Sequence, residues 1–136
     1  LDIWLRLYRL YREKESPHYR KSRNVDAAKR MILYIREHIT DSITVKDLAE
    51  SVFLSERECY RIFRECLHTT PTNYIISCRL QEACRLLTGS SASITEIAYS
   101  CGFGSGSYFS RMFTREMGCT PNEYRTTWQN RTNNSR

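Results

Sequence analysis

Apolar residues recur along the chain with the three- and four-residue spacing of amphipathic helices, and polar capping residues precede the runs. Between residues 26 and 38 they form one stripe, which consists of Ala28, Met31, Ile32 and Ile35. We expect a helix there that packs across the segment after it. A longer run covers residues 71–88, with Thr70 before Pro71 as a start and Thr88-Gly89 as a stop. At about seventeen residues it would extend roughly 25 Å.

Two short helices separated by a tight turn are predicted between these runs. Thr44 with Asp47, and Ser55 with Glu58, have the spacing of capping boxes, in which each side chain bonds the other's backbone N–H. The apolar face of the first short helix consists of Val45, Leu48, Ala49 and Val52. Because the second cap follows that face so closely, one helix must stop and the next begin across Phe53-Leu54.

The same plan recurs later in the chain. Ser93 and Glu96 open a helix, and Gly102 then supplies a residue that can take a positive φ at a turn. The apolar face of this helix consists of Ile94, Ile97, Ala98 and Cys101. Residues 104–106, Gly-Ser-Gly, lie at the start of the next helix, where exposed backbone N–H groups can meet a phosphate. A flexible loop is the alternative interpretation of this glycine-serine segment.

The two passages are copies of one unit. Leu48-Ala49 matches Ile97-Ala98 and Leu54 matches Phe103 at an offset of 49. The pairs at an offset of 50 are Arg61-Ile62-Phe63 with Arg111-Met112-Phe113, Thr70-Pro71 with Thr120-Pro121, and Tyr74 with Tyr124. One residue has therefore been inserted after Phe103. Short helix, tight turn and second helix form a helix-turn-helix, and internal duplication indicates two of them. Ala49 and Ala98 stand where the second helix crosses the first closely.

Two long segments of the sequence resemble segments of a known protein family. GFGSGSYFSRMFTREMGCTPNEYR, residues 102–125, resembles the signature of the AraC/XylS family of bacterial transcription regulators. YIISCRLQEACRLL, residues 74–87, resembles that family's linker helix. The resemblance implies an all-α fold in which two helix-turn-helix subdomains, residues 25–88 and 89–128, are joined by a linker helix over residues 71–88. It also implies a sequence-specific DNA-binding regulator in the bacterial cytoplasm rather than an enzyme.

The resemblance further implies how DNA would be bound. Recognition helices over about residues 55–66 and 105–117 would enter adjacent major-groove segments of one asymmetric promoter site. The DNA-binding residues carried over by position are Arg57, Tyr60, Arg61, Arg64, Ser105, Gly106, Ser107, Ser110, Arg111 and Arg115. Successive major-groove faces on one side of B-DNA repeat about every 34 Å, so a continuous helix between the units suits such a site. We expect the first unit to carry most of the sequence discrimination, because glycine and serines offer few strong base contacts.

The arginines of the first recognition helix have two interpretations. Arg57 and Arg61 are one helical turn apart and point away from the apolar face, so their guanidinium groups can contact guanine edges. The alternative is a solvated face on which Arg57, Arg61 and Arg64 pair with Glu58 and Glu65.

The first unit departs from the family pattern at two positions. Phe53 occupies a turn position where a small residue is usual, and a bulky side chain at positive φ is strained. We therefore expect either another turn shape or packing of Phe53 against its neighbours. His68 stands where the second copy has Gly118, so we expect the two recognition helices to end differently.

Charge and reactive side chains add little to this picture. The net charge of +6 lies in residues 1–24, with seven basic and three acidic groups, and in two arginines after residue 128; residues 25–128 hold twelve of each sign. The six cysteines have no CxxC spacing and fall mostly on apolar helix faces, which favours reduced thiols. No catalytic, metal or cofactor site is predicted. No run of eighteen apolar residues predicts a membrane span.

The ends of the chain are predicted separately. Within residues 1–24, residues 1–14 are predicted to form an amphipathic helix, and residues 15–24, where Pro17 breaks the helix, are predicted to form a polar linker. This helix could end an upstream sensor or dimerisation domain, pack on the DNA-binding domain, or lie on a membrane surface. Residues 129–136 are expected to be a disordered tail. The implied partners are duplex DNA, RNA polymerase at promoters and a second copy through the upstream domain; the alternative function is an all-helical protein-interaction module.

Overall fold

The computed structural model describes residues 17–135, and over this range the regular secondary structure is entirely helical. The elements are α2 (Pro17–Glu37), α3 (Val45–Ser51), α4 (Glu56–Ile62), the π-helical turn η1 (Phe63–Leu67), α5 (Pro71–Gly89), α6 (Ile94–Ser100), α7 (Gly106–Met117) and α8 (Pro121–Asn134). The all-α fold with two helix-turn-helix units is therefore confirmed. Within the described range, no helix combines the length and apolarity needed to cross a bilayer.

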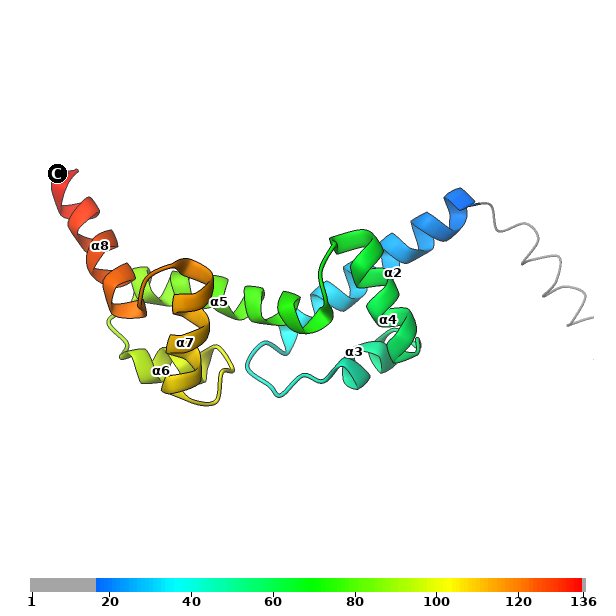
Figure 1. The fold of residues 1–136 in the computed structure, drawn as a ribbon, viewed down its shortest axis with the longest axis horizontal. Helices are drawn as coiled ribbons and strands as arrows, with labels where there is room; N and C mark the ends of the chain where they lie inside the picture. Colours follow the sequence, from blue (N-terminus) through cyan, green and yellow to red (C-terminus); the bar gives the residue numbers. More distant parts are fainter. Residues whose placement is uncertain (1–16, 136) are drawn as a thin grey trace, which may run out of the picture.

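The molecule is elongated, with α5 running through its middle (Figure 1). Helices α2, α3 and α4 gather around the N-terminal end of α5, and α6, α7 and α8 gather around its C-terminal end. We call these groups, each with its part of α5, the first and the second unit. The predicted linker helix is thus confirmed as one uninterrupted element.

Each unit has its own hydrophobic core. The first core consists of Ala28, Met31, Ile35, Leu48, Ala49, Cys59, Ile62, Phe63 and Ile75. The second core consists of Leu80, Ala83, Leu87, Ile97, Ala98, Cys101, Phe103, Phe109 and Phe113. The apolar faces predicted above supply five residues of the first core and three of the second. Each fully buried side chain of this size contributes about 1.5–3 kcal/mol, so the two cores are the main source of stability.

The turn of each helix-turn-helix has the same hydrogen bonds. The backbone N–H of Leu54 donates to the carbonyl oxygen of Ala49 at 2.9 Å, and that of Phe103 donates to Ala98 at 2.9 Å. Both alanines are almost completely buried, as expected where the next helix crosses. The extra residue of the second copy is Gly104, which has a φ of +78° just before the next helix.

The predicted caps are largely confirmed. Thr44 with Asp47 and Ser93 with Glu96 form complete capping boxes. Ser55 accepts from the backbone N–H of Glu58 at 3.1 Å, but the box predicted there is incomplete. The carboxylate of Glu58 instead accepts from Arg61, one turn further along α4.

Two predictions about the ends of the units are wrong. The first helix begins at Pro17 rather than at Asp26, so the part of the predicted linker after Pro17 is helical. Proline suits the first turn of a helix because the N–H that it lacks has no partner there. The last helix reaches Asn134, so residues 129–134 are not a disordered tail. The predicted amphipathic helix before Pro17 lies outside the described residues.

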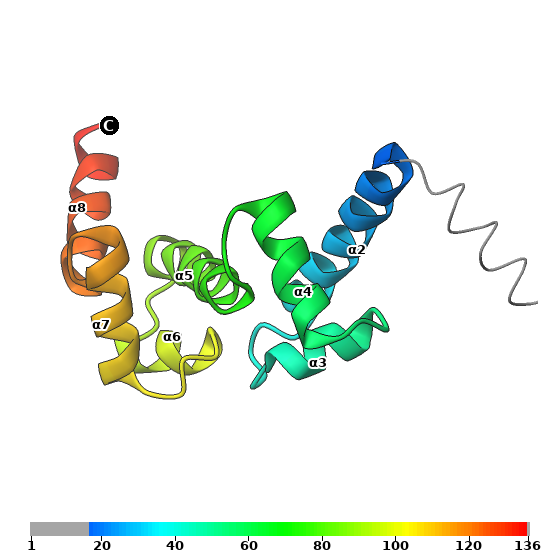
Figure 2. The ribbon, with the colours of Figure 1, turned by 45° about the vertical axis from the view of Figure 1, so that its right-hand side comes forward.

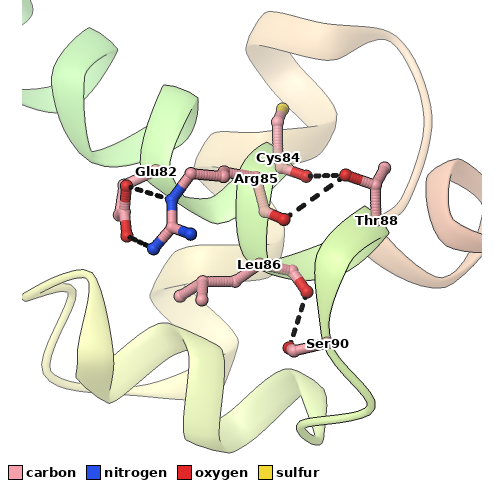
Figure 3. Close-up of polar contacts among 6 residues, drawn as sticks. All are labelled: Glu82, Cys84, Arg85, Leu86, Thr88 and Ser90. Carbon is pink, nitrogen blue, oxygen red and sulfur yellow. Dashed lines mark hydrogen bonds and ion pairs between the residues drawn. The ribbon is translucent and has the colours of Figure 1, made fainter.

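The C-terminal end of α5 is capped by side chains that hydrogen-bond to its backbone carbonyl oxygens. The hydroxyl groups of Thr88 and Ser90 donate to carbonyl oxygens of the last turns (Figure 3). Arg125 of α8 donates to the carbonyl oxygens of Leu87, Ser90 and Ala92 at 3.0, 3.4 and 2.7 Å. The last carbonyls of a helix have no partner within it, so these bonds satisfy them and hold α8 against α5.

Phe53 fits neither expectation, because the turn does not change shape and the ring does not pack against its neighbours. It has a φ of +57°, so the first turn keeps the shape of the second, and it is 96% exposed, so the ring packs against nothing. His68 has a φ of +54° and Gly118 a φ of +78°, so the two recognition helices end alike after all. A non-glycine residue in this conformation is strained by about 1–3 kcal/mol.

We expect Phe53→Gly to raise the free energy of unfolding by about 1 kcal/mol, because glycine tolerates positive φ and the exposed ring loses no packing. Urea denaturation followed by circular dichroism measures this. Phe53→Ala is the control, because it removes the ring but keeps the Cβ atom. Equal stabilisation by both substitutions would show that backbone strain is not the cause.

Candidate nucleic-acid interface

The two recognition helices are built alike. The first runs through α4 and η1, from Glu56 to Leu67, and the second is α7, from Gly106 to Met117. Ser55 and Ser105 cap them at an offset of 50. The N-terminal ends of α4 and α7 lie on the same side of the molecule, beside α3 and α6 (Figures 1 and 2). The molecule therefore presents two equivalent helix ends on one side.

The predicted site residues of the first unit share one surface. Arg57, Tyr60 and Arg64 are exposed and Arg61 is half-buried. They line one open hollow along the recognition helix, whose full lining is Ser55, Glu56, Arg57, Glu58, Tyr60, Arg61, Arg64 and Glu65. The structure thus brings together all four predicted residues of this unit. Glu56 was not predicted, although its position directly after the cap marks it as a first-turn residue.

Arg61 is held by two carboxylates. Its guanidinium group donates to Glu58 at 3.3 Å and to Glu65 at 3.1 Å, one turn to either side. Arg57 and Arg64 form no ion pair with any described residue. Of the ion pairs expected for a solvated face, those of Arg61 alone are present among the described residues. Three carboxylates and three guanidinium groups leave the first recognition helix with no net charge.

The second recognition helix has smaller side chains at its start. The hydroxyl group of Ser105 accepts from the backbone N–H of Tyr108 at 3.2 Å. A Cβ atom at Gly106 would lie in ordinary van der Waals contact with the Thr95 hydroxyl oxygen, at 3.4 Å, so this position lies close to α6. The side chain of Ser107 is exposed and that of Ser110 is half-buried.

The arginines of this helix lie further from its start. Arg111 and Arg115 are exposed, and Arg115 pairs with the neighbouring Glu116 at 3.2 Å. Two arginines against one carboxylate give α7 a small positive charge. The predicted residues of the second unit therefore share one helix, with small groups at its N-terminal end and basic groups beyond them.

Four of the six cysteines are poor nucleophiles. All six are free thiols. Burial raises the pKa of Cys59 and of Cys101 to about 11, and it also raises the pKa of Cys78 and Cys84. Thiol reactivity depends on the thiolate, so these groups are not activated at neutral pH. No group of metal-ligating side chains occurs among residues 17–135.

Comparison with known proteins gives the same class of protein as the geometry. A family model described as a helix-turn-helix domain matches residues 48–127. The chain is 37% identical over 97 residues to the uncharacterized HTH-type transcriptional regulator YdeC of Bacillus subtilis, covering 71% of this chain and 33% of that protein. It is 35% identical over 95 residues to the transcriptional activator RhaS of Escherichia coli, covering 70% of this chain and 34% of that protein.

Solved structures of the same fold are also similar. An AraC-type transcriptional regulator from Chromobacterium violaceum superposes with a TM-score of 0.74 and 30% identity, over 79% of this chain and 96% of that one. The DNA-binding domain of AdpA, solved in complex with a target DNA, superposes with a TM-score of 0.73 and 31% identity, over 77% of this chain and 94% of that one.

These matches define a helix-turn-helix transcription regulator. The chain belongs to the AraC family and contains the family's DNA-binding domain. It spans about a third of the length of the curated relatives that it matches.

We expect Cys59 and Cys101 to react slowly with a thiol reagent in the native protein at pH 8. A pKa of about 11 leaves roughly a hundredfold less thiolate than an unperturbed thiol has. The rate should rise with pH toward 11, because the thiolate forms only there. Peptide mapping after timed alkylation measures this, with the unfolded protein in guanidinium as the control. Equal labelling rates in the native and unfolded protein would contradict the burial of these thiols.

Proposed function

We propose that this domain binds duplex DNA by placing α4 and α7 in successive major-groove segments of one asymmetric site. The observation that carries the proposal is that two capped recognition helices start on one side of the molecule and are joined by a continuous helix. At 19 residues, α5 is about 28 Å long, close to the 34 Å repeat of the major groove. The AdpA domain, which shares the fold, is complexed with its target DNA.

The first recognition helix is suited to sequence discrimination. Arg57 and Arg64 are free to move to guanine edges or phosphates, whereas Arg61 is held in place by Glu58 and Glu65. A pre-positioned guanidinium group loses less side-chain freedom when it binds, and a bidentate contact to guanine discriminates by about 1–3 kcal/mol. Since this helix has no net charge, it gains little from non-specific attraction to phosphate.

The second recognition helix is suited to close approach. Gly106 and Ser107 have no bulk to keep the start of α7 away from the DNA backbone, and the helix dipole there favours phosphate. Arg111 is its strongest candidate for a base contact, with Arg115 further toward phosphate. We therefore infer that the first unit discriminates among sequences and that the second mainly anchors the domain.

The wider role follows from the family. We propose that the protein regulates transcription in the bacterial cytoplasm, acts with RNA polymerase at promoters, and pairs with a second copy through an upstream domain. We propose no catalytic activity for this domain.

The experiment that tests the function is selection of bound sites from random duplexes, followed by affinity measurement at several salt concentrations. We expect one asymmetric pair of segments about ten base pairs apart, centre to centre, and a linear fall of log affinity with log salt. Single-base substitutions in the segment bound by the first unit should weaken binding more. An all-helical protein-interaction module would show no enriched sequence.

We expect Arg61→Ala to weaken binding to the selected site about tenfold or more while changing binding to random duplex little, because it removes a base contact. Fluorescence anisotropy on both duplexes measures the two affinities. Arg64→Ala is the matched control, since it removes the same charge one turn along the helix and should weaken both affinities alike. A uniform loss with Arg61→Ala would make Arg61 a phosphate contact instead.

A further inference from the structure

The two units have separate hydrophobic cores. The first and second cores contain no common residue, and α5 supplies Ile75 to one and Leu80, Ala83 and Leu87 to the other. A helix that is packed at both ends still leaves each unit some freedom to tilt about it. The contacts that limit this tilt therefore decide how the two recognition helices are oriented relative to each other.

Arg79 makes one such contact from the middle of α5. Its Nε donates to the carbonyl oxygen of Ile39 at 3.2 Å and its Nη2 donates to that of Asp41 at 2.8 Å. Both carbonyls belong to the loop between α2 and α3, in the first unit. The guanidinium group is half-buried, and its Nε lies 3.1 Å from a Cβ atom placed on Gly102 of the second unit.

Gly102 of the second unit lies against the same loop between α2 and α3 that Arg79 binds. It is the turn residue of the second helix-turn-helix and has a φ of +84°. A Cβ atom there would collide with the carbonyl oxygen of Ile39, the atom that Arg79 binds, and would lie 3.3 Å from the Cα of Thr40. Gly118 has a similar φ of +78°, but nothing lies within 4 Å of a Cβ atom placed on it. Gly102 is thus required for close approach as well as for its backbone conformation.

We propose that Arg79 and Gly102 form an inter-unit lock that fixes the angle between α4 and α7, and so determines which spacing of the two DNA segments the protein accepts. This inference rests on the proposed function. Each base pair inserted between the segments moves one of them by about 3.4 Å and turns it by about 35° around the duplex. A rigid pair of units binds one spacing tightly. A loosened pair would bind several spacings, each with a lower affinity.

The test uses the selected duplex and derivatives with one or two base pairs inserted or deleted between the segments. We expect Arg79→Ala to bind the preferred spacing about tenfold more weakly, because the second unit is no longer pre-oriented. Its affinity should fall less steeply than that of the wild type when the spacing changes. Binding to a duplex that contains only the first segment should not change. Arg85→Ala is the control, since Arg85 lies on the same helix and, among the described residues, forms an ion pair with Glu82 of that helix alone (Figure 3).

A second pair of variants separates the lock from general stability. Gly102→Ala adds both backbone strain and the collision with Ile39, whereas Gly118→Ala adds similar strain without a neighbour. At temperatures where both variants are folded by circular dichroism, we expect only Gly102→Ala to flatten the spacing profile.

The outcomes are distinct. An unchanged spacing profile in Arg79→Ala, or an equal loss on the single-segment duplex, would overturn the lock. A flattened profile in Arg85→Ala or Gly118→Ala would overturn it too, because the effect would then not belong to this junction. A wild-type protein without any sequence preference would overturn the proposed function itself, and the spacing role with it.

Discussion

The burial of both ends of α5 is the constraint on which the rest of the structure depends. One continuous run of backbone hydrogen bonds passes from the first core to the second, so neither unit can shift along the helix without exposing apolar side chains. The closed C-terminal end, with Arg125 bound to three carbonyls, keeps the last turn from fraying. The recognition helices owe their common direction to this element, although neither of them contributes to it.

The repeated unit shows how one backbone plan accommodates different side chains. The turn hydrogen bonds and the left-handed helix ends are the same in both copies, although Phe53 and His68 stand where the second copy has glycine. The packing of Ala49, Ile62 and Phe63 in the first core therefore stabilises the turn enough to offset strain of a few kcal/mol. At Gly102 the same conformation also has a neighbour, and there no side chain could be accommodated.

Much of the fold could be predicted because its signals are local. Capping residues, proline in the first turn and helical spacing depend on a few neighbouring residues, so Thr44, Thr70 and Ser93 mark helix starts correctly. The predictions for the capping box at Ser55 and for the start of the first helix were wrong because two local signals compete at each position. Glu58 can bond its own cap or Arg61, and Pro17 can end one helix or begin another. The contact of Arg79 with the loop between α2 and α3 could not be predicted, because its partners lie about forty residues away in the sequence. They are also backbone carbonyl oxygens, which every residue has, so no residue type marks them.

The early start of α2 has a mechanical consequence. The chain before Pro17 is joined to the first unit through a 21-residue helix rather than through a polar linker. A helix transmits torsion, so adding or removing one residue within it swings whatever precedes it by about 100° and shifts it by about 1.5 Å. The number of residues in α2, more than their identity, therefore sets the direction in which its N-terminal end points relative to the first unit.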